Sequence, residues 1–133
     1  MDEYHALLRR IGELKGLSAP WRGVVYRNAS LRYASGKDLL AGEGSSQAGG
    51  RWNPRGLRAV YASLTPETAM AETLSAFRRY GWDIADAMPR VFVAVRVSFA
   101  VALDLNRGDV RQRLRVSLRR MLADDWRTAQ RAG

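Results

Sequence analysis

Apolar side chains recur at intervals of three and four residues near both ends of the chain. In residues 2–15 this spacing predicts an amphipathic helix, with Gly16 as its stop. Near the C-terminal end, Asp109 is placed to cap a longer helix over residues 109–128. A helix is therefore expected at each end. The apolar stripe expected along the second one consists of Val110, Leu114, Ser117, Leu118, Met121, Leu122 and Trp126.

The middle of the chain mixes strand and helix patterns. Thr65-Pro66-Glu67 has the composition of an N-cap, a first helical residue and a first-turn acid, so a helix is expected over residues 66–80. Short strands and helices without regular β-α alternation indicate an α+β fold rather than a doubly wound sheet, and 133 residues are enough for one domain. β-Branched and aromatic runs predict strands over residues 21–28, 59–63, 90–99 and 101–105.

Residues 29–50 have no clear periodicity and contain several glycines and serines. A stretch of this length is uncommon in a compact domain unless it is functional, and Tyr33 and the Leu39-Leu40 pair are expected to anchor it, with a short helix there. It leads into Gly49-Gly50-Arg51-Trp52-Asn53-Pro54. The two glycines let a backbone approach a ligand closely, and Arg51 offers a planar fork of donors that suits phosphate or carboxylate.

Tyr61, Glu72 and Arg27 complete this candidate site. Tyr61 lies in the predicted strand 59–63, and Glu72 lies two turns into the following helix. Arg27 and its neighbour Tyr26 face opposite sides of a strand, so Arg27 is expected to line a cleft or the surface. Taken singly, Glu72 and Arg51 fit ordinary surface charges, but together they indicate a site for a phosphate-bearing ligand. At about 100° per residue, Glu72 shares a helix face with the small residues Thr68, Ala69, Ser75 and Ala76, and not with Met70, Leu74 and Phe77.

The composition narrows the chemistry. The net charge is +9 with a pI near 11.0, which favours an anionic partner: nucleic acid, an acidic protein or a small phosphate ligand. The absence of cysteine excludes disulfides and thiol nucleophiles, and the single histidine, His5, argues against a histidine-ligated metal or a triad. No apolar run could span a bilayer, and the first residues do not begin a signal peptide, so a cytoplasmic protein is expected. A solvated face is the favoured interpretation of the arginine cluster, which lacks interleaved aromatics and comprises Arg111, Arg113, Arg115, Arg119 and Arg120.

Several blocks of the chain carry a resemblance to a known family. In order, these blocks are WRGVVYR, YASGKDLLAGEGSSQAGGRWNP, VYASLTPETAMAE, AMPRVFVAVRV, LDL and LADDWR. From about Trp21 to its end, the chain resembles the RES-domain family, the toxins of toxin-antitoxin pairs. The resemblance implies an ADP-ribosyltransferase-like mixed sheet with flanking helices, and a cognate antitoxin as partner. It also implies degradation of NAD at the nicotinamide-ribose bond, with NAD as substrate, no metal, and water or phosphate as acceptor.

The resemblance also assigns roles to residues. Arg27 and Arg51 match arginines of the family pattern, Tyr33 and Tyr61 match its aromatic positions, and Glu72 matches its glutamate. Glu72, Arg51 and Tyr61 are thereby implied as catalytic. The implied NAD-binding residues are Arg27, Tyr33, Gly50, Arg51 and Tyr61.

The chain departs from the family at its serine, which lies further along in the family than any matching position here. Ser98 and Ser117 stand in other contexts and do not receive its role. The chain is thus either a natural short form or a fragment without the last strands. Missing strands would leave an open sheet edge, a tendency to self-associate and an incomplete pocket with little NAD turnover. The alternative function is a catalytically silent basic module that binds nucleic acid or an acidic protein.

Overall fold

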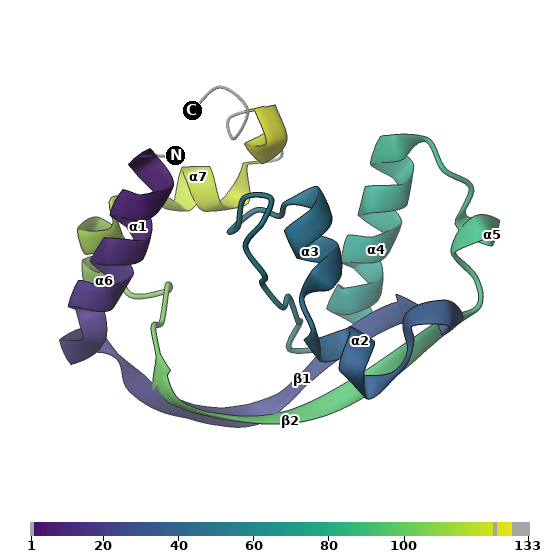
Figure 1. Cartoon of the computed structure of the whole chain (residues 1–133), viewed down its shortest axis with the longest axis horizontal. Coiled ribbons are helices and arrows are strands. Elements are labelled where there is room, and N and C mark those ends of the chain that lie inside the picture. The colour runs from purple at the N-terminus through teal and green to yellow at the C-terminus, as the bar shows by residue number, and fades with distance from the viewer. Residues whose placement is uncertain (1, 124, 129–133) are drawn as a thin grey trace. The chain divides into compact units, whose positions relative to one another are not determined.

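The computed structural model describes residues 2–123 and 125–128. The chain divides into two compact units, one formed by Met1–Trp21 with Ser98–Gly133 and the other by Arg22–Val97. The single domain expected over residues 1–133 remains a prediction. In chain order the elements in Figure 1 are α1 (Asp2–Glu13), the 3-10 helix η1 (Leu14–Leu17), β1 (Ala19–Ser30), the 3-10 helix η2 (Leu31–Tyr33), α2 (Gly36–Leu40), α3 (Glu43–Ala48), α4 (Pro66–Tyr80), α5 (Ile84–Ala87), β2 (Arg90–Ala102), α6 (Gly108–Leu114) and α7 (Leu118–Leu122).

The sheet is a pair of antiparallel strands, β1 and β2. Helices beside this sheet confirm the α+β class. The strands predicted over 21–28 and 90–99 are confirmed, and both are longer than predicted. The separate strand predicted over 101–105 is wrong, because β2 continues without a break to Ala102. The predicted strand 59–63 is reduced to an isolated bridge between Tyr26 and Ser63.

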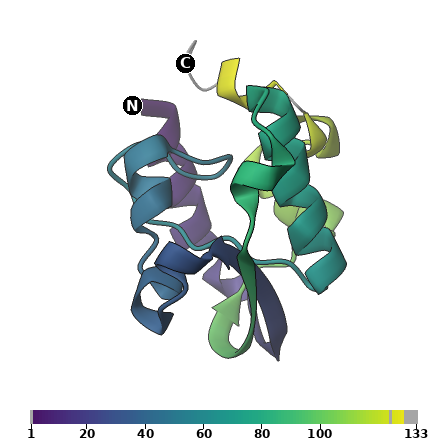
Figure 2. The ribbon, with the colours of Figure 1, turned by 90° about the vertical axis from the view of Figure 1, so that its right-hand side faces the viewer.

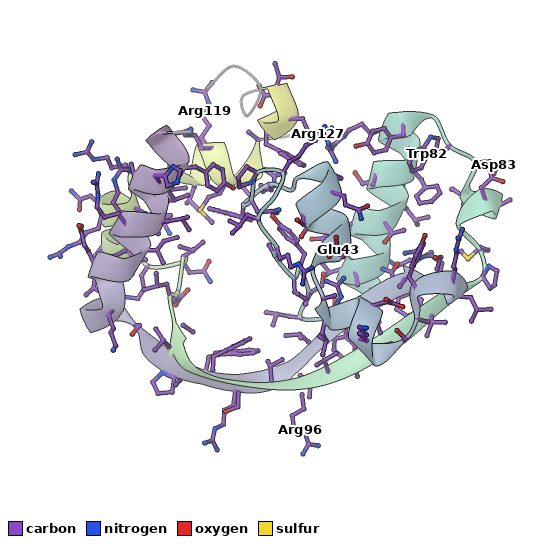
Figure 3. The ribbon with its side chains drawn as sticks, viewed as in Figure 1. Glu43, Trp82, Asp83, Arg96, Arg119 and Arg127 are labelled. Carbon is purple, nitrogen blue, oxygen red and sulfur yellow. The ribbon has the colours of Figure 1, made fainter. Side chains whose placement is uncertain are left out.

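Along β2 the side chains alternate as a pleated strand requires. Positions 91, 93, 95 and 97 are partly buried, whereas positions 92, 94, 96 and 98 are exposed. Figure 3 shows Arg96, one of the exposed set, extending from β2 away from α3 and α4. This part of β2 therefore has one covered face and one solvated face.

In the unit made of the two chain ends, α1, η1 and α6 pack around a small apolar cluster. Leu14, Val110 and Leu114 are buried at its centre. Arg10 Nη1 donates to the Leu114 carbonyl oxygen at 3.4 Å, which links α1 to the end of α6. The partly buried side chains packed against this centre are Leu7, Leu17, Leu103, Leu105 and Val116.

The continuous helix predicted over residues 109–128 is wrong. The chain forms α6 and then α7, and it breaks at Arg115, whose φ of 58° lies in the left-handed region. Ser117 then caps α7, because its hydroxyl accepts a hydrogen bond from the Arg120 N–H at 3.2 Å. Leu118 and Leu122 of the predicted stripe are exposed. Residue 124 of the predicted span lies outside the described residues.

In the other unit, α4 has the bounds and the N-cap that the sequence predicted. Thr65 Oγ1 accepts from the Thr68 N–H at 3.1 Å, and Pro66 is the first helical residue. Gly81 ends the helix with a φ of 67°. The short helix expected at Leu39 is confirmed as α2, and Leu39 is buried. The other two predicted anchors are wrong, because Leu40 and Tyr33 are exposed. In the view of Figure 2, α4 lies on one side and α2 and α3 on the other, with the adjoining ends of β1 and β2 between them.

Asn28 on β1 fixes α4 to the sheet. Its Nδ2 donates to the Ala69 carbonyl oxygen at 2.8 Å. Its Oδ1 accepts from Thr73 Oγ1 at 2.9 Å and from Arg90 Nε at 2.6 Å. Ala69 is buried at this contact, whereas Met70 of the predicted core face is only partly buried. Ala69, which the sequence grouped with Glu72 on one helix face, is thus covered by the strand, whereas Glu72 is exposed.

Candidate active site

An extended segment, residues 59–65, connects the glycine-rich loop to α4 and passes beside β1. The Tyr26 N–H donates to the Ser63 carbonyl oxygen at 2.7 Å, and the Ser63 N–H donates back to the Tyr26 carbonyl oxygen at 2.9 Å. This pair of bonds sets the register between the segment and β1. It places Tyr61 and Ser63 next to the strand that carries Arg27.

Arg27 reaches from β1 to this segment. Its Nη1 donates to the Tyr61 carbonyl oxygen, and its Nε is buried without a hydrogen-bond partner among the described residues. Burial lowers the pKa of Arg27 from its ordinary value. The bond to the Tyr61 carbonyl oxygen fixes the guanidinium. The planar group keeps further N–H groups that could donate hydrogen bonds to an anion.

The loop that carries Arg51 is held by Tyr61 and Asn53. The Tyr61 hydroxyl donates to Asn53 Oδ1 at 2.7 Å and accepts from the Trp52 N–H at 2.7 Å. Asn53 is fully buried, and its Nδ2 donates to the carbonyl oxygens of Ser45 at 2.8 Å and Leu57 at 2.7 Å. The loop is thus fixed by hydrogen bonds to buried groups rather than by apolar packing.

The electrostatics of Tyr61 follow from this enclosure. Burial raises the pKa of its hydroxyl, while the Trp52 N–H, the charge of Arg51 and the bond to Asn53 act in the opposite direction. Burial is the largest of these effects, so the pKa lies above its ordinary value and the phenol is neutral at pH 7. Because the Tyr61 hydroxyl bonds to the Trp52 N–H and lies next to Gly50, the turn that carries Arg51 lies beside the phenol.

Gly50 is required by packing inside the loop. A Cβ at this position would lie 2.6 Å from Asn53 Oδ1 and 2.6 Å from the Tyr61 hydroxyl oxygen. Gly50 and Asn53 also form a bridge, with Arg51 and Trp52 at the turn between them. The sequence predicted that this glycine admits a ligand, whereas the observed neighbours are the side chains that support the Arg51 turn.

Glu72 lies on the exposed side of α4, next to the same segment. Ser63 Oγ donates to Glu72 Oε2 at 3.3 Å. Ser63 itself is only 7% exposed, so its hydroxyl is held in place next to the carboxylate. Thr68 and Ser75 of the predicted small-residue face are exposed beside Glu72. The contact ties α4 to the segment that also receives Arg27.

Four of the predicted site residues are therefore gathered around residues 61–63. Arg27 bonds to the Tyr61 backbone, Arg51 lies in the turn that the Tyr61 hydroxyl holds through the Trp52 N–H, and Glu72 bonds to Ser63. Tyr33 is not part of this group: its side chain is 55% exposed on η2, with the Arg32 guanidinium 5.5 Å from its ring centre.

Sequence reasoning missed Asn53 and Ser63. Both belong to blocks that the sequence singled out, but neither was given a role. For Ser63 the usable signal was its position two residues after Tyr61, which places both on the same side of an extended segment. For Asn53 the signal was an amide between Trp52 and Pro54, in a turn that has few other side chains to stabilise it.

The described residues contain no group of three or more histidine, cysteine, aspartate or glutamate side chains placed to hold a metal ion. Within the same residues, no helix combines the length and the apolar character that crossing a membrane requires. The arrangement at residues 61–63 thus offers two guanidinium groups, one carboxylate, a neutral phenol and a hydroxyl. These groups can bind an anionic ligand and stabilise a positive charge beside it.

The chain is similar to known proteins in sequence and in structure. A family model described as the RES domain matches residues 10–133. The crystal structure of the M. tuberculosis MbcT-MbcA toxin-antitoxin complex contains a similar chain, with a TM-score of 0.72 and 26% sequence identity. That similarity covers 93% of this chain and 66% of the other, so this chain spans a little less than two thirds of its neighbour's length. No curated protein matches the chain.

Proposed function

Because the chain belongs to the RES domain family, we propose that it is the toxin of a toxin-antitoxin pair and that it cleaves NAD at the nicotinamide-ribose bond. The observation that carries the proposal is the gathering of Arg27, Arg51 and Glu72 around residues 61–63. Two guanidinium groups suit the pyrophosphate of NAD, and a carboxylate suits the ribose. The structural neighbour, which is part of a toxin-antitoxin complex, supports the toxin role.

The chemistry proposed for Glu72 follows from the bond that breaks. The ribose-nitrogen bond cleaves with its electron pair moving to nicotinamide, and positive charge develops on the ribose as in glycoside cleavage. The Glu72 carboxylate stabilises this charge directly or through a ribose hydroxyl. An oxygen of water or phosphate then bonds to the ribose carbon and releases its proton to solvent. Nicotinamide leaves as a neutral base, so no strong general acid is needed, and transfer to a macromolecule would follow the same course.

The other residues of the proposed site have separate roles. Arg27 and Arg51 bind the pyrophosphate, and the proposed NAD contact of Gly50 is made through its backbone. Tyr61 contributes by holding the Arg51 turn, since its hydroxyl proton is already donated to Asn53. Tyr33 enters the proposal through the family resemblance alone. The reaction requires no metal, and it places the protein in the cytoplasm, where NAD is available.

A cognate antitoxin completes the proposal. The net charge of +9 favours an acidic binding surface on such a protein. Self-association of the toxin through an exposed strand edge is a further expectation of the same proposal, since an unpaired edge is a template for another strand.

The test of the proposed chemistry is Glu72→Gln, which keeps the shape of the side chain and removes its charge. We expect the rate of nicotinamide release from NAD to fall about a hundredfold or more, the scale of losing one electrostatic contact to a transition state. Glu67→Gln is the matched control, because Glu67 is an exposed glutamate in the first turn of the same helix. Both variants should keep the parental melting temperature. A Glu72→Gln protein that consumes NAD at the parental rate would show that the carboxylate has been wrongly assigned.

A further inference from the structure

Ser63 combines burial, a fixed backbone and a contact to the proposed reactive carboxylate. Its exposed fraction is 7%, and both its N–H and its carbonyl oxygen are bonded to Tyr26 at 2.9 and 2.7 Å. Its hydroxyl donates to Glu72 Oε2 at 3.3 Å. A buried polar side chain is costly unless its hydrogen bonds are satisfied, and here the partner is a carboxylate on an exposed helix face.

The two partners differ in how much freedom they have. Once the backbone of Ser63 is fixed against β1, a single side-chain rotation decides where its hydroxyl points. Glu72 has three rotatable bonds and an exposed side chain, so without a partner its carboxylate would sample many orientations. The donor is therefore the fixed member of the pair, and the carboxylate is the member that becomes ordered.

The length of the contact also fits a role in the reaction. At 3.3 Å the bond is longer than an ordinary bond between a hydroxyl and a carboxylate. Hydrogen bonds between catalytic groups often shorten when substrate binds. Since Ser63 occupies Oε2, the second oxygen, Oε1, remains for the ribose.

We propose that Ser63 is a positioning residue, whose hydroxyl orients the Glu72 carboxylate toward the ribose of bound NAD. This inference rests on the proposed function. It gives a role to a serine that precedes the glutamate in the chain and that sequence reasoning left without one. The segment that holds Arg27 through the Tyr61 carbonyl thus also holds Glu72 through Ser63.

A merely structural Ser63 would act differently from a positioning one. Loss of packing would lower the melting temperature and would affect the reaction whether or not Glu72 is present. A hydroxyl that acts through the carboxylate has an effect only while the carboxylate is there. The two cases therefore separate in a double-mutant cycle between Ser63→Ala and Glu72→Gln.

The experiment measures initial rates of nicotinamide release over a range of NAD concentrations, with NAD in excess over protein, for the parental chain, the two single variants and the double variant. We expect Ser63→Ala to lower kcat about tenfold, as for one hydrogen bond to a charged group, with KM changed less than about twofold. In the Glu72→Gln background, Ser63→Ala should cause no further loss. Ser75→Ala, which removes an exposed hydroxyl from the same helix face, is the control and should behave as the parent.

Every result of this experiment either supports or overturns the role proposed for Ser63. An unchanged kcat in Ser63→Ala, or a further loss in the Glu72→Gln background, overturns the positioning role and leaves the proposed function standing. No NAD consumption by the parental chain, or full activity in Glu72→Gln, overturns the proposed function and this inference with it. If Ser63→Ala also melts earlier, Ser63→Thr decides: a restored kcat in this hydroxyl-bearing variant supports positioning, and a kcat as low as that of the alanine variant overturns it.

Discussion

Asn53 is the residue on which the shape of the Arg51 turn depends. Its side chain is fully buried, and it connects the carbonyl oxygens of Ser45 and Leu57 to the hydroxyl of Tyr61. No other amide side chain among the described residues is fully buried. Removing the amide would therefore take away its hydrogen bonds to two backbone carbonyl oxygens and to the Tyr61 hydroxyl at a fully buried position.

Asn53→Ala should therefore lower the free energy of unfolding by about 1–3 kcal/mol, the range for buried polar groups left unsatisfied. Urea denaturation followed by circular dichroism measures this. Asn106→Ala is a matched control, since Asn106 is exposed, and it should change stability by less than about 0.5 kcal/mol. Equal stabilities for the two variants would mean that the buried amide does not support the turn.

The two arginines of the proposed site are held in place in different ways. Arg27 is fixed by its bond to the Tyr61 carbonyl oxygen, whereas Arg51 depends on the turn between Gly50 and Asn53. Both present planar forks, and a fork can donate to two phosphate oxygens where an ammonium group offers only a point charge. Their contributions to NAD affinity should reflect this geometry.

Arg27→Ala and Arg51→Ala should each weaken NAD binding about tenfold or more, because each removes charged hydrogen bonds to the pyrophosphate. Lysine at either position should restore only part of the affinity. Calorimetric titration of NAD into the Glu72→Gln background, where turnover is slow, measures the effect. Arg96→Ala is the control, since Arg96 extends from β2 away from α3 and α4 (Figure 3). Unchanged affinity in both site variants would exclude the pyrophosphate role.

The sequence anticipated the groups proposed for the site better than their supports. Arg51 stands out because it follows two glycines, Glu72 because it shares a helix face with small residues, and Arg27 because strand alternation turns it away from the side of Tyr26. Ser63 and Asn53 are ordinary polar residues until the chain brings Tyr26 against Ser63 and Tyr61 over Gly50. Those contacts join segments that are distant in sequence, and no local pattern encodes them.

At the scale of elements, the cap residues decided which predictions succeeded. The helix at Pro66–Tyr80 was predicted correctly because Thr65 and Gly81 both mark its ends in the sequence. The break between α6 and α7 has no such mark, since Arg115 is neither glycine nor proline and the apolar spacing continues across it. The Val116 N–H bonds to the Arg111 carbonyl oxygen at 3.0 Å, so the turn closes α6 with a left-handed arginine.

A left-handed residue with a Cβ costs about 1–2 kcal/mol, and glycine avoids most of that cost. Arg115→Gly should thus raise the free energy of unfolding by about 0.5–1 kcal/mol. Arg113→Gly removes the same charge from inside α6 and should lower stability by about 0.5–1 kcal/mol. Thermal and urea unfolding of the two variants measure the contrast. Destabilisation by both would mean that the chain continues as one helix through Arg115.

At the scale of the whole molecule, the proposed site and the apolar cluster belong to different units. The site residues that gather around residues 61–63 all lie within Arg22–Val97, whereas Leu14, Val110 and Leu114 lie in the unit formed by the chain ends. Arginines dominate the charge of the chain, and several of them follow Val110 in α6 and α7. The electrostatic question is therefore whether this charge serves NAD chemistry or nucleic-acid binding.

Salt dependence separates these two uses of the charge. NAD carries two phosphates, so its affinity should fall by no more than about tenfold between 50 and 200 mM salt, whereas a nucleic acid held through six or more phosphates should lose about a thousandfold. The measurement is NAD affinity by calorimetry in the Glu72→Gln background, beside binding of a labelled single-stranded oligonucleotide across the same salt range. Replacing Arg113 and Arg119 by glutamine should leave the NAD values unchanged, because both side chains are exposed outside the unit that holds the proposed site. Tight oligonucleotide binding with a steep salt slope, together with no NAD affinity, would favour the basic binding module over the enzyme.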